Sequence, residues 1–431
     1  MKYLSMNRRI KKINYNYHRD IRLILSSFKE KFLDKYYPGN EKAESLFKRD
    51  LQRLSANFSI LFFFQYSLFS KYWFHKKIYQ SIIFSGDTDN IEEHIQRASL
   101  SGTLLYLPNH QAHIDSLIMS WIANYLRVPQ PLFYAWNTLA RRRSAYLMPM
   151  VNACLLDRQV MDERFQCPDP FRNTREYRFG YTVLIEEYLR FMLARGVDTL
   201  IYPEGGRSYS GAVGEARIKR IFKDTRKTQE NLGHQRIISV VPLSITYSLV
   251  PEAGKLIESF HSGQIISPSS LFHDLTDADN LYRSFTPNYR TKTDFPLVRA
   301  FTEKRIPIFC VMGKPISLWD DKKITLYECF EVVKKNLKIL PHHFFARLLL
   351  NNPAGMIAKL KTAGIASLLE PARSLRDSLQ NVTLDVAFYD DQGLADILSI
   401  GMEFFRYGGW ISAEAEIRNG GVLEYYSNKI K

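Results

Sequence analysis

A histidine and an aspartate follow the first β-like run in the central part of the chain. Residues 104–107 lead into Pro108, His110 and Asp115, after which an apolar helical pattern begins. On one regular helix His110 and Asp115 would lie about 140° apart, because an α-helix has 3.6 residues per turn. They can meet if His110 lies on the loop and Asp115 one turn into the helix. The carboxylate would then fix the imidazole tautomer while the other ring nitrogen removes a proton from an alcohol.

The same two residues have a purely structural interpretation. A histidine can be a polar turn residue, and an aspartate is favoured in the first turn of a helix by the helix dipole. An isolated HxxxxD motif fits this interpretation more often than it marks a catalytic pair. The catalytic interpretation therefore depends on a second cluster elsewhere in the chain.

A second cluster follows the β-like residues 200–202. It reads Pro-Glu-Gly-Gly-Arg-Ser and includes Glu204 and Arg207. Adjacent glycines permit a sharp turn that brings backbone amides close to a ligand, and the planar guanidinium of Arg207 suits phosphate. A surface turn with a solvated arginine is the alternative. The spacing is not that of a P-loop, and a serine at position 210 excludes the GxSxG nucleophile elbow.

Composition indicates a globular chain with anionic partners. The 431 residues are 45% hydrophobic and 13% aromatic, with a formal net charge of +15, which excludes a disordered polar chain. Such a charge favours phospholipid headgroups, nucleic acid, phosphorylated substrates or an acidic carrier protein, and it does not choose among them. The sequence contains no RNP-like aromatic motif or zinc finger, so we expect no nucleic-acid partner.

The cysteines and the first residues indicate a cytosolic compartment. Cys154, Cys167, Cys310 and Cys329 are far apart and form no CxxC pair, so they match neither a disulfide framework nor a zinc site. We expect reduced thiols and no metal. The first dozen residues are basic but lack the apolar segment of a secretory signal.

An uncharged, apolar stretch covers residues 54–70, between Arg53 and Lys71. A membrane-spanning helix needs roughly 20 mostly apolar residues, and this stretch is interrupted by serine, asparagine and glutamine. It fits a buried core helix or an interfacial helix held by flanking basic and aromatic residues, among them Lys76, Lys77 and residues 72–74. A transmembrane span fits least well.

The pattern divides the chain into three regions. Residues 1–90 are predicted to be helical, with a possible helix at the membrane interface. Residues 91–320 alternate strand-like and helical patterns, as an α/β domain does, and residues 321–431 are helical again. The predicted strands cover 103–107, 199–202, 237–245 and 308–312, and the clearest central helices cover 114–126 and 182–194. Residues 254–304 are polar and irregular, which indicates an insertion of loops and short helices.

These segments, in this order and spacing, resemble the glycerol-3-phosphate and dihydroxyacetone-phosphate acyltransferase family. The blocks at 110–115 and 204–208 look most like the bacterial glycerol-3-phosphate branch, the first because a second histidine, His113, precedes the aspartate. Residues 153–158 are similar to the family's apolar block ending in arginine, and residues 241–247 to its fourth block. The tail at 423–428 also resembles the family's C-terminal segment. The resemblance covers about residues 90–320 well and the remainder more thinly.

The resemblance implies a fold, a reaction and a site. The fold is the HxxxxD acyltransferase fold, a mixed β-sheet flanked by helices, with helical regions at both ends. His110 is the base that deprotonates the acceptor hydroxyl, Asp115 orients it, and no acyl-enzyme forms. The substrate-binding residues implied are Arg158, Glu204, Gly205, Gly206, Arg207 and Ser208.

The reaction implied is transfer of a fatty acyl group from an acyl thioester to the sn-1 hydroxyl of glycerol 3-phosphate, giving lysophosphatidate for phospholipid synthesis. No cofactor is expected beyond acyl-CoA or acyl carrier protein as co-substrate. The expected location is the cytoplasmic face of a membrane with an anionic surface, either peripheral or through a short interfacial helix.

Three points stay open at the level of the sequence. The acceptor could be dihydroxyacetone phosphate or lysophosphatidate. The protein could also be a non-catalytic, basic lipid- or nucleic-acid-binding module. Finally, Asp157 stands where the family usually has a first arginine before Arg158, which puts this part of the phosphate site in question.

Overall fold

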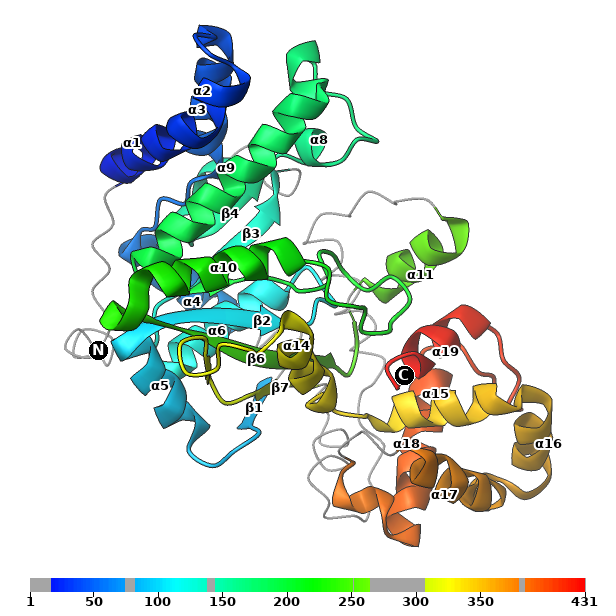
Figure 1. Ribbon diagram of the computed structural model, residues 1–431. Helices are drawn as coiled ribbons and strands as arrows, with labels where there is room; N and C mark the ends of the chain where they lie inside the picture. Colours follow the sequence, from blue (N-terminus) through cyan, green and yellow to red (C-terminus); the bar gives the residue numbers. More distant parts are fainter. Residues whose placement is uncertain are drawn as a thin grey trace.

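The computed structural model describes residues 17–73, 82–137, 144–250, 252–263, 307–379 and 384–430. At its centre lies an eight-stranded mixed sheet with helices on both faces, and further helices precede and follow it (Figure 1). The predicted α/β fold with helical terminal regions is confirmed. The strands are β1 (Ile82–Gly86), β2 (Gly102–Pro108), β3 (Leu132–Trp136), β4 (Ala153–Leu156), β5 (Thr199–Leu200), β6 (Ile237–Tyr247), β7 (Ile308–Met312) and β8 (Ile316–Ser317).

Strand direction determines where a site can form. The order is β1-β7-β6-β2-β5-β3-β4, with β8 paired to β6. Strands β6, β2, β5, β3 and β4 run parallel to one another, whereas β7 and β8 run antiparallel to β6. Five strands therefore end at the same edge of the sheet, and ligands of open α/β sheets bind at such carboxyl ends.

Strand β2 is buried on both faces. Leu104 and Tyr106 pack in one core with α5 and α6, while Leu105 and Leu107 pack in another with α9 and α10. A strand covered on both sides needs a continuous apolar run, which is the pattern of residues 104–107. Figure 1 shows α10 in front of the strands and α6 behind them. The helices of this region are α5 (Ile91–Ser101), α6 (Asp115–Leu126), α7 (Ser144–Met150), α8 (Arg158–Met161), α9 (Arg175–Ala194), α10 (Lys219–Leu232) and α11 (Ala253–Ser262).

The N-terminal helices pack on α9 through aromatic side chains. Phe28, Phe32 and Phe47 are buried in one cluster with the side chains of α9. Gly180 makes the approach possible, because a Cβ there would lie 2.4 Å from a ring atom of Phe32. These helices are α1 (Tyr17–Phe28), a π-helical turn (Lys29–Leu33), α2 (Asp34–Tyr36) and α3 (Glu41–Leu54).

The apolar stretch 54–70 is divided between two helices. Helix α3 ends at Leu54 and α4 covers Ile60–Trp73. Phe63 is buried in the core shared with α6, whereas Leu61 and Leu68 are 68% and 53% exposed. Among the residues that the structure describes, no helix has the length and apolarity needed to cross a membrane. The side chains at 71–73, with residues 74–81 and the basic residues 1–16, lie outside what the structure describes.

The C-terminal helices gather beside the carboxyl edge of the sheet (Figure 1). Their apolar side chains join the same core as β6 and α6. Most of the predicted irregular insertion, residues 264–306, lies outside the described part of the chain. The helices are α14 (Leu326–Lys335), α15 (Pro341–Asn351), α16 (Pro353–Ala363), α17 (Leu369–Ser378), α18 (Asp391–Tyr407) and α19 (Gly420–Ser427).

Not every predicted element is found as expected. Strand β7 has the predicted bounds, β2 and β6 extend slightly beyond theirs, and β5 ends at Leu200 rather than at position 202. The helix predicted over 114–126 begins at Asp115 and ends at Leu126. The prediction that residues 1–90 are helical is wrong for Ile82–Gly86, which form β1. This strand is stabilised by pairing with β7, a contact that local pattern does not reveal.

A buried ion pair joins α3 to the segment before α9. Arg172 donates to Asp50 at 2.9 Å and to Asp157 at 3.0 Å, with all three side chains largely buried. Removing the cation leaves two buried carboxylates uncompensated. We therefore expect Arg172→Met to lower the free energy of unfolding by about 3–5 kcal/mol. Urea unfolding followed by circular dichroism measures this loss.

Arg164 provides the matched control. Its pair with Asp162 is largely exposed on the arginine side, so Arg164→Met should cost only about 0–1 kcal/mol. Equal losses in the two variants would contradict the structural importance of the buried pair.

Candidate functional site

The loop after β2 brings His110 and Asp115 into contact. His110 Nδ1 lies 2.8 Å from Asp115 Oδ2, and the two side chains are 18% and 0% exposed. A carboxylate only accepts hydrogen bonds, so Nδ1 carries the proton of this contact. Within the described residues Nε2 has no hydrogen-bond partner, which leaves its lone pair for another group. The predicted pairing between a loop histidine and a first-turn aspartate is present.

The carboxylate of Asp115 organises the whole loop. Its Oδ2 also accepts the backbone N–H groups of Gln111 at 2.8 Å and Ala112 at 3.1 Å. Its Oδ1 accepts the hydroxyl of Tyr247, at the end of β6. A buried carboxylate is tolerated only when its oxygens are satisfied in this way. Asp115 thus holds the imidazole, the turn and the neighbouring strand in one arrangement.

Glu204 connects the His110 loop to the loop after β5. Its Oε2 accepts the backbone N–H of His110 and its Oε1 that of Gly214, both at 2.7 Å. Burial raises the pKa of Glu204, and these two bonds act in the opposite direction. Ser208 N donates to the carbonyl of His110 at 3.0 Å. The expected contact of Glu204 with a polyol stays a prediction, since both oxygens face backbone amides.

A stacked aromatic ring sets the orientation of the imidazole. The rings of His110 and Tyr202 lie 3.8 Å apart at the centroids, with an angle of 17° between their planes. Tyr202 is the second residue after β5, which pairs with β2, so its ring lies beside the loop after β2. With Nδ1 fixed by Asp115 and one face covered by Tyr202, the imidazole has little rotational freedom.

Arg207 lies in a buried cluster of charges. Its Nη1 donates to Glu252, and the same nitrogen is 3.4 Å from His113 Nδ1. His113 Nδ1 is in turn 3.2 Å from Glu252. Burial alone would raise the pKa of Glu252, but the hydrogen bonds and charges of His113 and Arg207 lower it to about 2. The carboxylate therefore stays ionised and fixes the arginine.

The remaining predicted residues of this loop have different environments. Gly205 has a φ of +71°, a conformation that glycine adopts at no steric cost. A Cβ on Gly206 would have no neighbour within 4 Å. The hydroxyl of Ser208 donates to the carbonyl of Ala212. Their expected contacts with substrate stay predictions.

Arg158 follows β4, which is separated from β5 by β3. Its guanidinium carbon lies 4.7 Å from the centroid of the Phe165 ring. The preceding carboxylate, Asp157, accepts from Arg172, so its charge is compensated. The structure brings His110, Asp115, Glu204 and Arg207 together; Arg158 shares the edge of the sheet at a greater distance.

Sequence reasoning gave no role to Tyr247 or Glu252. Tyr247 is part of the recognised block at 241–247, but the motif does not reveal that its hydroxyl reaches Asp115. Glu252 follows β6 without any motif, and only the parallel arrangement of β2 and β6 brings it to His113.

The described residues contain no group of histidine, cysteine, aspartate and glutamate able to hold a metal ion. All four cysteines are buried and none forms a disulfide.

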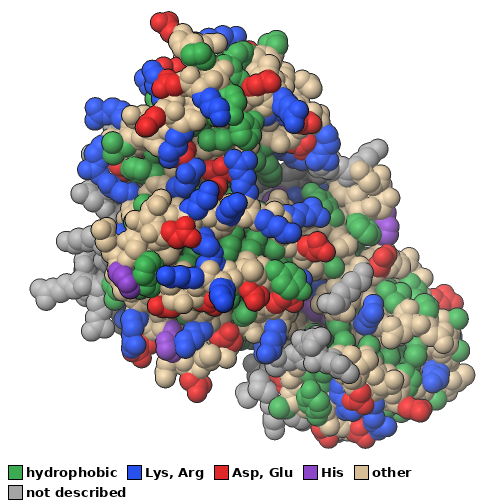
Figure 2. All heavy atoms as spheres, in the orientation of Figure 1, with side chains coloured by type: hydrophobic (Ala, Val, Ile, Leu, Met, Phe, Trp, Pro, Cys, Tyr) green, Lys and Arg blue, Asp and Glu red, His purple; other side chains and the backbone are tan. Residues whose placement is uncertain are grey.

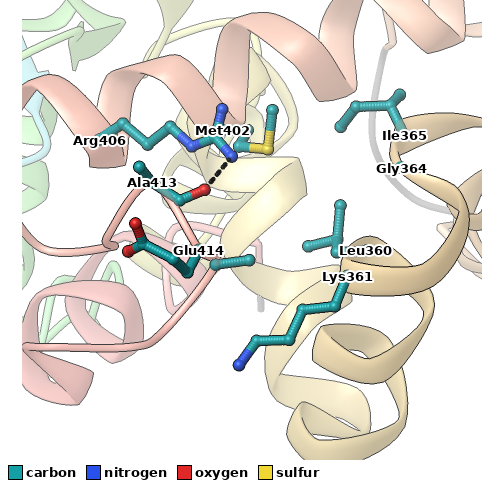
Figure 3. A pocket seen from close by; sticks show the side chains of 9 residues that line it. Leu360, Lys361, Gly364, Ile365, Met402, Arg406, Ala413 and Glu414 are labelled. Atoms are coloured by element: carbon teal, nitrogen blue, oxygen red, sulfur yellow. Dashed lines mark hydrogen bonds between the residues drawn. The ribbon is translucent and has the colours of Figure 1, made fainter.

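A cavity of about 350 Å³ lies away from these residues, among the C-terminal helices (Figure 3). It is lined by Leu360 and Lys361 of α16, by Met402 and Arg406 of α18, and by residues 413–415. Arg406 donates to the carbonyl of Ala413 at 2.9 Å (Figure 3). Lys361 pairs with Glu416 and Arg406 with Glu403. No histidine lines the cavity, so it lacks the acid–base pair found at His110.

The depressed pKa of Glu252 gives a pH-dependent contribution to stability. Its ordinary value is 4.5 and its value in the fold is about 2. The contribution of the ionised Glu252 carboxylate to the free energy of unfolding is therefore complete above about pH 5. It is lost as pH falls towards 2. We expect Glu252→Gln to lower the free energy of unfolding by roughly 3 kcal/mol near pH 7, with the difference from wild type shrinking below pH 5.

Denaturant unfolding between pH 3 and pH 7 measures this difference. Glu230→Gln, a change at an exposed position of α10, serves as the control and should leave the curve almost unchanged. A wild-type advantage that stays constant down to pH 3 would show that Glu252 is not held ionised by Arg207 and His113.

Comparisons with known proteins relate the central part of the chain to one family. Residues 87–246 match the family model described as Acyltransferase. A glycerol-3-phosphate acyltransferase of Pseudomonas paraeruginosa is 26% identical over 216 residues, which are 49% of this chain and 23% of that protein. The enzyme of the same name from Histophilus somni is 26% identical over 181 residues, which are 42% of this chain and 20% of that protein. The chain thus spans less than a quarter of the length of these relatives.

A solved structure of the 1-acyl-sn-glycerophosphate acyltransferase of Thermotoga maritima aligns with 74% of this chain and 95% of that one. The identity is 15% and the TM-score 0.34, which is too low to support a conclusion. The family match is independent of it and covers the loops after β2, β4 and β5. Residues 87–246, with His110, Asp115 and Arg207, are therefore an acyltransferase-family domain.

Proposed function

We propose that this protein transfers a fatty acyl group from an acyl thioester to the sn-1 hydroxyl of glycerol 3-phosphate, which yields lysophosphatidate. The observation that carries the proposal is the contact between His110 Nδ1 and the fully buried Asp115, with Nε2 left available. The acyltransferase family match and the names of the bacterial relatives support it.

The proposed chemistry needs a base and accurate positioning. The Nε2 atom of His110 takes the proton of the acceptor hydroxyl as its oxygen attacks the thioester carbonyl. The acyl carbon–sulfur bond breaks, the ester bond forms, and the imidazolium returns its proton to the departing thiolate. Asp115 stabilises the imidazolium while it exists. Because a thioester is already activated, no covalent acyl-enzyme is required.

The phosphate of the acceptor is proposed to bind near Arg207. Within the described residues, the hydrogen bonds of this guanidinium are made by Nη1. Its other N–H groups can therefore face an anion. The Gly205-Gly206 turn, Glu204 and Ser208 are proposed to shape the polyol site. Arg158 is proposed as a second, more distant contact for anionic substrate.

A basic surface supports an anionic membrane as the partner that receives the product. Figure 2 shows Lys and Arg side chains gathered over the face that α9 and α10 cover. Exposed basic residues of this surface include Arg217, Lys219, Arg220, Lys223 and Lys227. Helix α4, with its exposed Leu61 and Leu68, packs with α6 on the other face of the sheet and is not part of this surface. Basic side chains near an anionic bilayer each contribute about 1 kcal/mol to binding.

The general-base role predicts large losses of turnover. His110→Ala should reduce kcat by about two to four orders of magnitude, and Asp115→Asn should act similarly through the wrong tautomer. The measurement is transfer of radiolabelled acyl groups from acyl-CoA and from acyl carrier protein to glycerol 3-phosphate. Parallel assays with dihydroxyacetone phosphate and lysophosphatidate identify the preferred acceptor.

His234→Ala is the matched control, because His234 is exposed and precedes β6, at the opposite edge of the sheet. Its kcat should stay near that of wild type. Retention of more than about a tenth of wild-type turnover in His110→Ala would contradict the proposed base.

The membrane proposal predicts charge-dependent binding. We expect the purified protein to float with anionic vesicles at low salt and to bind neutral vesicles less, because salt screens exposed charges. Lys223→Glu with Lys227→Glu, on α10, should weaken flotation. Lys359→Glu with Lys361→Glu, on the C-terminal helix α16, makes the same charge change elsewhere and should leave flotation unchanged. Equal binding to both vesicle types at any salt concentration would exclude an electrostatic contribution.

A further inference from the structure

The segment around α19 docks directly against the loop that follows Arg207. Asn428 Nδ2 donates to the carbonyl of Ser210 at 2.9 Å. Gly211 has a φ of +88°, and a Cβ there would lie 2.0 Å from the carbonyl oxygen of Tyr425. Only glycine permits this approach of the two backbones. The C-terminal helices are thus fixed to the candidate site.

This docking places a lysine beside the His110 loop. Lys429 Nζ donates to Gln111 Oε1 at 2.9 Å and lies 4.7 Å from the centroid of the Tyr425 ring. Gln111 is the residue after His110, and its backbone N–H is one of the donors to Asp115. The ammonium group is therefore one side chain away from the catalytic pair.

The charges around Lys429 leave it able to bind an anion. Its recorded hydrogen bond goes to a neutral amide, whereas Arg207 is paired with Glu252. The nearby carboxylates of Glu204 and Asp115 are already engaged with backbone N–H groups and with Tyr247 or His110. Neither carboxylate is in direct contact with the ammonium among the recorded bonds.

The other titratable groups that face Lys429 add no charge near pH 7. His342 and His343, on α15, are fully buried. Burial lowers the pKa of both well below the ordinary value, and the charge of Lys429 acts in the same direction, so both are neutral. The pKa of Tyr425 is raised well above its ordinary value by burial.

A buried hydroxyl next to Lys429 also lacks a partner. Tyr425 is 1% exposed, and within the described residues its hydroxyl makes no hydrogen bond. Tyr425 is also close enough to Glu252 and Arg207 for their charges to affect its pKa. Buried hydroxyls are nearly always hydrogen-bonded, so the Tyr425 hydroxyl can donate to a group that enters the site.

We propose that Lys429 is a substrate-binding residue whose ammonium group holds the phosphate of the phosphorylated acceptor, with the Tyr425 hydroxyl as a second donor. The proposal rests on the proposed function of the His110 site. Arg207 and Lys429 would then have different roles in binding. Arg207 is oriented by its ion pair with Glu252, whereas the hydrogen bond of Lys429 goes to the neutral amide of Gln111.

The proposal has a pH signature. Burial lowers the pKa of Lys429, and the charges of Glu204 and Asp115 act in the opposite direction, which leaves it at about 7. A bound phosphate favours the protonated amine and raises this pKa. Affinity for the acceptor should therefore decline as pH rises from 7 to 9. The phosphate itself is already dianionic there, since its second pKa is about 6.

Steady-state kinetics of three variants tests the proposal. Lys429→Met should raise KM for glycerol 3-phosphate by about tenfold to a hundredfold, the range for losing a charged hydrogen bond, with KM for the thioester and kcat changed little. Lys429→Arg should restore much of the affinity and abolish its decline between pH 7 and 9, because arginine stays protonated. Lys359→Met, at an exposed lysine of α16, should behave as wild type.

The alternatives give different results. A fall in kcat with unchanged KM for the acceptor would mean that Lys429 only positions Gln111, and a raised KM for acyl-CoA would assign it to the donor. Either result overturns the proposal. If Lys429→Met does not fold, the pH profile of Lys429→Arg decides, and a profile identical to wild type overturns it. Failure of the wild-type protein to acylate any acceptor would instead refute the proposed function.

Discussion

The buried carboxylate of Asp115 is the constraint on which the rest of the site depends. An ionised carboxylate without solvent costs several kcal/mol unless each oxygen is bound. Here an imidazole, two backbone amides and a tyrosine hydroxyl meet that demand. These donors come from the loop after β2 and from the end of β6, so satisfying one side chain fixes the relative placement of two strands.

Two further buried carboxylates, like Asp115, bind donors from different loops along the edge of the sheet. Glu204 joins the loops after β2 and β5 through backbone amides, and Glu252 joins the segment after β6 to His113 and Arg207. Each crosses between segments that are distant in sequence. The parallel strands bring the loops together, and the acidic side chains then fix the positions of the loops relative to one another.

The sequence pattern predicted the elements whose conformation depends on their own residues and near neighbours in the chain. The apolar runs of β2, β6 and β7 predict buried strands. The HxxxxD motif predicts the contact of His110 with Asp115. Strands β1 and β3 are short and only partly buried, so their pairing partners rather than their own composition decide their conformation. Glu252 and Lys429 belong to no motif, because their contacts with the site depend on the topology of the sheet and the docking of α19.

The contact between Gln111 and Lys429 closes a loop of 318 residues. The entropy of closing a chain grows only with the logarithm of its length, so the equilibrium cost differs little from that of a much shorter loop. The kinetic consequence is larger, because contacts between distant segments form late in folding. We therefore expect the sheet and the His110 loop to form first, in a species with native-like secondary structure. The contact of Lys429 with Gln111 would form last. Recovery of catalytic competence during refolding would then lag behind recovery of the helical signal.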